Sequence, residues 1–455
     1  MKKRIAEQSI LFVSVLKWVF LATVVGALVG LSTSLFLLAL NAATEFTGRF
    51  QYYFLALPAA FCLSVILVRR LAPEAEGHGT EKVIEAVHKR SGKIPVAVVP
   101  VKLAATVITL ASGGSAGKEG PCAQIGGGLA SAMADLFQFA AKDRKKLVIC
   151  GISAGFASVF GTPIAGAIFG VEVLFVGGLL YDVLLPSFVS GIMAYQVSAA
   201  LGVNYFSHSI PFTPVFHESF FLMVALSGVY FGICSFLFIE MLAAADRLSR
   251  ALPWSQMQKA LAGGALVALA GLIFSTRFLG LGLETIEQAL KGGTVSWFAF
   301  PLKALLTAVT LNFGGSGGIV TPLFFLGATS GSLFANITGL DAATFSAIGL
   351  VAVLAGAANT PIAAAILSIE LFGRSIGPYA CVACVISFLM TGHRSVYPSQ
   401  ILSVKKSQSL DVAIGEEMED VRARIQIREK SLVSVIVRNF RTVRKWIQSG
   451  PRRGK

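Results

Sequence analysis

A glycine-rich pattern that occurs twice constrains the fold of this chain more than any other feature. Residues 113–121 read GGSAGKEGP, and residues 314–322, which lie 201 positions further on, read GGSGGIVTP. A second match has an offset of 198: TPIA at 162–165 with Glu172, and TPIA at 360–363 with Glu370. Two matches in the same order and at nearly the same offset indicate an internal duplication, and we expect the repeats to cover about residues 10–200 and 215–400.

The composition places both repeats in a membrane. Apolar residues make up 55% of the 455 positions and charged residues only 14%, against about 25% charged in an ordinary soluble domain. Half of the net charge of +14 lies in the last 55 residues, which hold 13 Lys/Arg and 6 Asp/Glu. We therefore expect a transmembrane domain over residues 1–405 and a short basic cytoplasmic tail over residues 406–455.

The apolar run near the N-terminus, residues 11–40, is too long for a cleavable signal peptide and long enough to span a bilayer. Basic residues near both ends predict that both termini face the cytoplasm. Several later apolar runs are too short to cross a hydrocarbon core of about 30 Å and are broken by glycine and proline. This pattern predicts an all-α polytopic membrane protein of short, tilted and broken helices.

Paired breaks in two repeats predict a binding site between them at the middle of the membrane. A glycine-rich turn that opens a helix exposes unpaired backbone N–H groups and the positive end of the helix dipole. Such a site binds an anion without a fixed full charge, and binding of this kind is weak enough to permit release. The sequence therefore favours an anion transporter or channel.

Four segments resemble motifs of the CLC family of chloride channels and chloride/proton antiporters, and the similarity extends over about residues 10–405. The resemblance implies the CLC fold with two inverted-topology repeats, a homodimer with a pore in each subunit, and an integral protein of a prokaryotic inner membrane. It implies chloride as the transported ligand and no cofactor. The four segments are GKEGP at 117–121, GGIVTP at 317–322, PEAEGHG at 73–79 and SVY at 395–397.

The resemblance also implies the roles of particular residues. Glu119 would be the gate, because an ionised carboxylate can occupy an anion site itself and a protonated one can leave it. Backbone N–H groups at Ile319 and Val320, and the Tyr397 hydroxyl, would bind the central anion. The full predicted anion-binding set is His78, Gly79, Lys118, Gly120, Gly318, Ile319, Val320 and Tyr397.

Three positions depart from the family pattern. Val320 stands where phenylalanine is usual, so the site would be wider. His78 stands where the best-known members have serine; a neutral imidazole would donate a hydrogen bond as serine does, whereas a cationic one would strengthen anion binding at low pH. Glu81 replaces the usual proline, which makes the start of the following helix less typical.

The residue at 173 bears on the mechanism. Antiporters of the family commonly carry a second glutamate there to relay protons, and this chain has Val173, preceded by Glu172. Valine carries no proton, so we expect channel-like anion conduction. Two alternatives remain open: chloride/proton exchange by a nonstandard path through Glu119 and Glu172, and selectivity for another anion such as nitrate or fluoride. We interpret Glu172 and Glu370 first as structural.

Other charged and polar residues add no further function. Lys102 and Lys303 interrupt apolar runs, and we expect them to snorkel to an interface. The five histidines and six cysteines form no pattern of metal ligands. No nucleic-acid motif accompanies the basic tail, whose expected partner is the lipid bilayer. Because the chain lacks a nucleophile–base pair and a phosphate-binding loop, we expect no enzymatic activity.

Overall fold

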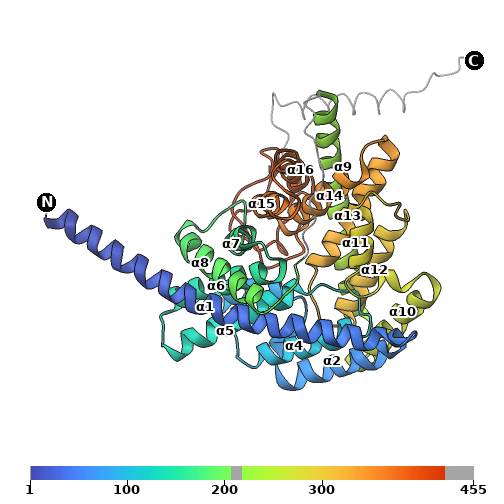
Figure 1. Ribbon diagram of the computed structural model, residues 1–455, viewed down its shortest axis with the longest axis horizontal. Helices are drawn as coiled ribbons and strands as arrows, with labels where there is room; N and C mark the ends of the chain where they lie inside the picture. Colours follow the sequence, from blue (N-terminus) through green and yellow to red (C-terminus); the bar gives the residue numbers. More distant parts are fainter. Residues whose placement is uncertain (1, 206–217, 426–455) are drawn as a thin grey trace, which may run out of the picture.

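The structure is a computed structural model that describes residues 2–205 and 218–425. Within these ranges it contains 16 α-helices, three short 3-10 helices and four strands of two residues each (Figure 1). The first half supplies α1 (Lys2–Gly48), α2 (Leu57–Leu71), α3 (Gly79–Lys89), α4 (Val98–Ala111), α5 (Glu119–Leu136), α6 (Ala141–Phe160), α7 (Pro163–Glu172) and α8 (Tyr181–Ala200).

The second half repeats this order, so that α9 to α16 correspond in turn to α1 to α8. Its helices are α9 (Glu218–Ala251), α10 (Gln256–Ile273), α11 (Leu283–Leu290), α12 (Ala299–Asn312), α13 (Val320–Thr338), α14 (Ala342–Ala358), α15 (Pro361–Phe372) and α16 (Gly377–Met390). Local stops repeat as well. Gly161 (φ 72°) and Asn359 (φ 56°) adopt left-handed conformations after α6 and α14, and Pro163 and Pro361 begin the next helices, where the fixed φ of proline suits a first turn.

Helix lengths agree with a membrane protein built from unequal segments. Six helices in the described ranges are long and apolar enough to cross a membrane, and six further apolar helices have only 10–17 residues. The long helix α1 runs along one edge of the body, and its N-terminal turns extend beyond it (Figure 1). Short and long helices lie together, as predicted.

The two glycine-rich loops hold the halves together through reciprocal hydrogen bonds. Ser115 N donates to Thr310 Oγ1 at 3.1 Å, and the equivalent Ser316 N donates to Thr109 Oγ1 at 3.0 Å. The N–H of Gly117 donates to the Gly318 carbonyl and the N–H of Gly318 to that of Gly117, both at 2.7 Å. This bridge is antiparallel, as two equivalent segments related by a two-fold axis must be.

Glu172 and Glu370 form a second reciprocal contact between the halves. The carboxylate of Glu172 accepts the N–H groups of Ile362 and Ala363 at 3.0 and 2.7 Å, at the start of α15. The carboxylate of Glu370 accepts those of Ile164 and Ala165 at 3.1 and 2.7 Å, at the start of α7. Each acid therefore satisfies backbone donors that a helix start leaves unpaired.

The segment after α16 crosses back to the first half. Strand β2 (Ile401–Leu402) pairs in parallel with β1 (Phe175–Val176), and β3 (Leu410–Asp411) pairs antiparallel with β4 (Arg424–Ile425). Val412, Met418 and Val421 form one buried cluster with Val176 and Leu402. The first 20 residues of the predicted tail thus lie on the body, and residues 426–455 lie outside the described part.

Candidate anion site

Three helix starts meet between the two glycine-rich loops. The N-terminal ends of α3, α5 and α13 approach so closely that a Cβ on Gly120 would lie 3.0 Å from the Gly318 Cα. Gly79 packs against the backbone of Gly120, and His78 bridges to Gly317 of the other half. Backbone contact at this range is open only to glycine. Because the positive ends of three helix dipoles point into one region, the region attracts an anion.

Glu119, the first residue of α5, is the acidic side chain at this meeting point, and it is 1% exposed. Its Oε2 accepts the backbone N–H of Thr321 at 3.0 Å, in the first turn of α13. Its Oε1 accepts the Thr321 hydroxyl. A Cβ at Gly117 would lie 2.5 Å from Oε2, so the glycine makes room for the carboxylate. Glu119 therefore occupies the helix start where a free anion would bind.

Tyr397 closes the site from the side of the segment after α16. It is fully buried, and its backbone N–H donates to the Ser395 hydroxyl at 2.9 Å. The Thr80 hydroxyl adjoins that of Tyr397. Within the described ranges, neither hydroxyl has a hydrogen-bond partner of good geometry. Two adjacent buried hydroxyls that do not satisfy each other with good geometry can donate to an anion.

Two buried lysines support the site and its repeat mate, and the prediction that they snorkel is wrong. Both are 0% exposed. Lys102 donates to the carbonyls of Ala75 and Gly77 at 3.1 and 2.5 Å, directly before α3. Lys303 donates to the carbonyls before α11, at 3.1 and 2.7 Å. Each ammonium fixes a chain bend before a helix start, and the offset of 201 between the lysines was the signal of a shared structural role.

The structure brings together the predicted residues of the helix starts. Ile319 and Val320 are buried at the start of α13, and Lys118 lies half-buried before α5. The buried Nδ1 of His78 lacks a partner among the described residues, and the charge of Lys102 acts on this imidazole. Thr321, Thr80 and Glu81 were not predicted as site residues. Their hydroxyl and carboxylate groups, one to three positions after Gly79 and Gly318, were the available signal.

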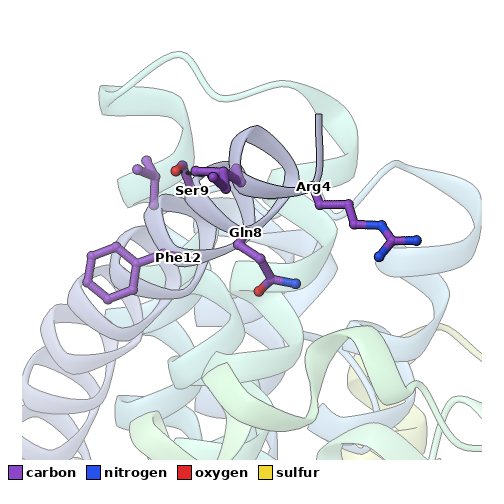
Figure 2. Close-up of a pocket in the computed structure, with 6 residues that line it drawn as sticks. Arg4, Gln8, Ser9 and Phe12 are labelled. Atoms are coloured by element: carbon purple, nitrogen blue, oxygen red, sulfur yellow. Dashed lines mark hydrogen bonds between the residues drawn. The ribbon is translucent and has the colours of Figure 1, made fainter. Parts of the chain in front are cut away.

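Glu172 and Val173 lie elsewhere. Both oxygens of Glu172 are engaged at the start of α15, and the fully buried Val173 offers only its carbonyl, to Gln400 Nε2 at 2.7 Å. The described ranges hold no cluster of three His, Cys, Asp or Glu that could bind a metal. The surface hollow in Figure 2 is lined by α1 alone, between Arg4 and Val13. A single helix offers no opposing wall, so this hollow adds no site.

The fold is that of a polytopic membrane protein whose two repeats meet at buried, glycine-rich helix starts. Residues 59–392 match the family model described as voltage gated chloride channel. The chain is 37% identical over 407 residues to the chloride/fluoride channel protein of Pseudomonas syringae pv. tomato, with 88% of this chain and 89% of that protein covered. The chain belongs to the CLC family of voltage gated chloride channels, and the expected family is thereby confirmed.

Other similar proteins include transporters that exchange ions for protons. The chain is 28% identical to the H(+)/Cl(-) exchange transporter ClcA of Klebsiella pneumoniae, with 77% of this chain and 80% of that one covered. A solved CLC-type fluoride/proton antiporter superposes with a TM-score of 0.81 at 29% identity, covering 85% and 98%. A slow cyanobacterial Cl−/H+ antiporter gives 0.72 at 21% identity, covering 82% and 94%. The predicted fold of two inverted repeats is confirmed.

Proposed function

We propose that the chain transports chloride through a pore in each subunit of a homodimer, and that Glu119 gates this pore. One observation carries the proposal: the Glu119 carboxylate accepts the Thr321 N–H at the start of α13, so it competes with an anion for the same donors. Protonation removes its charge and weakens both bonds to Thr321. The side chain then leaves, and chloride takes its place.

We further propose that transport is channel-like, in the plasma membrane of a prokaryote and with both termini in the cytoplasm. Val173 provides no carboxylate to relay protons, and Glu172 is engaged with α15. The relative from P. syringae, named a chloride/fluoride channel protein, supports this choice. Neutral helix starts bind chloride weakly enough for rapid release.

Proton-coupled exchange is the second candidate, and selectivity for fluoride or nitrate is the third. The similarity to a fluoride/proton antiporter favours the second. A path through Glu172 fits poorly, because both of its oxygens are occupied. The departures at His78 and Val320 favour a test of anions other than chloride.

The proposal is tested in vesicles that contain the purified protein. We expect chloride flux in the unmodified protein to rise as pH falls, by up to about 10-fold per pH unit for one titrating carboxylate. The Glu119→Gln protein should conduct at a high rate that does not change with pH, because an amide does not titrate. Glu45→Gln, at an exposed end of α1, is the control.

The reversal potential distinguishes channel from antiporter. For a channel it follows the chloride gradient alone, and we expect it to stay fixed when only the pH gradient is changed. A shift with the pH gradient would contradict channel-like transport and favour exchange. Full pH dependence in the Glu119→Gln protein would contradict the gate. Replacing chloride by nitrate or fluoride in the same measurement ranks the anions.

A further inference from the structure

Glu81 presents a second carboxylate beside the anion site, on the side covered by the segment after α16. It is the third residue of α3. Its Oε1 accepts the backbone N–H of Ser399 at 3.0 Å and the Ser399 hydroxyl at 2.6 Å. Its Oε2 is buried and has no hydrogen-bond partner among the residues that the structure describes. One oxygen is therefore fixed, and the other is open.

The charged groups around Glu81 leave this second oxygen uncompensated. Lys82 and Glu85 on the same helix act on it, but Lys82 is committed to an ion pair with Glu85 at 2.9 Å. From the segment after α16, the Tyr397 hydroxyl is close enough to be influenced by the charges of both Glu81 and Glu119. Tyr397 is thus near both carboxylates, in the region of the proposed anion site.

An uncompensated buried carboxylate is costly, and a proton on its open oxygen relieves the cost. An anion at the central site adds repulsion between like charges, which favours the protonated form further. Binding of the anion and of the proton then strengthen each other, and the linkage is reciprocal. We propose that Glu81 takes up a proton when chloride enters the central site, and that it is the proton-binding group on this side of the pore.

Comparison with two other glutamates supports this assignment, which rests on the proposed anion site. Glu172 accepts one N–H of α15 on each oxygen, so neither of its oxygens is left without a hydrogen-bond partner. Glu284, which follows Gly282 as Glu81 follows Gly79 at the equivalent place before α11, is exposed. The difference comes from the segment after α16. This segment covers α3, through Ser399 and through the ion pair of Lys89 with Glu417 at 2.8 Å.

The test measures proton uptake on chloride binding by calorimetry, in two buffers of different ionisation enthalpy, with the purified full chain in detergent. The Glu119→Gln background removes the other carboxylate of the site. Chloride is the probe because fluoride itself binds protons. In this background we expect uptake approaching about one proton per bound chloride, and less than about one tenth of that after Glu81→Gln is added.

Further variants separate a proton-binding role from a structural one. Glu81→Asp should restore uptake, because it restores a titrating group. Glu45→Gln, at an exposed end of α1, should leave uptake unchanged. Equal uptake with and without Glu81→Gln overturns the assignment while the anion site stands. Absence of chloride binding in the unmodified protein overturns the anion site and this inference together. Unchanged melting temperatures exclude unfolding as the cause of a loss.

Discussion

The two halves of the chain have matched residues in their supporting contacts and an unmatched residue, Glu119, at the proposed gate. Ser115 and Ser316 each donate to a threonine of the other half, and Lys102 and Lys303 hold equivalent bends. At the first position of α5 and α13, however, the first half has Glu119 and the second has Val320. Glu119 of the first half contacts the start of α13, whereas Val320 brings no carboxylate to the start of α5. Only one of the two helix starts is therefore occupied by a carboxylate.

Removing this asymmetry should have the largest effect. Val320→Glu would put a second carboxylate at the equivalent helix start, so both starts would carry a fixed negative charge. A buried charge at membrane depth costs about 3 kcal/mol, and we expect chloride efflux from vesicles to fall by about 100-fold, the factor for that energy. Glutamine has nearly the size of glutamate but no charge, so the Val320→Gln protein should keep most of the flux. Equal loss in both variants would indicate a packing effect.

The meeting of the helix starts beside Glu119 could be predicted from sequence, because a close approach of two backbones needs glycine and the duplication showed which glycines belong together. Contacts between segments that are distant in sequence could not be predicted. Nothing near Glu81 indicates that Ser399, 318 positions away, binds its carboxylate. The ammonium group of a lysine in an apolar run can either reach the membrane interface or donate to buried carbonyls. Lys102 takes the second because the bend at Ala75–Gly77 presents two carbonyl oxygens to it.

Lys102 and Lys303 make equivalent hydrogen bonds in the two halves, and substituting each tests whether both contribute to chloride binding. Lys102→Met and Lys303→Met each leave two carbonyls without their donor, and we expect both to destabilise the protein by about 1–3 kcal/mol. Only Lys102 stands behind α3 at the anion site, so only Lys102→Met should also weaken chloride binding, by about 10-fold or about 1.4 kcal/mol. Calorimetric chloride titrations and thermal unfolding measure the two effects. Equal loss of affinity in both variants would show that the effect comes from destabilisation alone.

The smallest effect on chloride transport is expected for the reciprocal glutamates, which differ in exposure. Glu172 is 4% exposed, whereas Glu370 is half-buried. Glu172→Ala should leave the Ile362 and Ala363 N–H groups without partners in a dry place, at a cost of about 2–3 kcal/mol. Glu370→Ala should cost about 1 kcal/mol, typical of a lost helix cap that water can partly replace. Thermal unfolding in detergent compares them. Because neither acid touches the anion site, chloride flux per folded protein should stay the same in both variants, and a selective loss of flux in Glu172→Ala would contradict a purely structural role for Glu172.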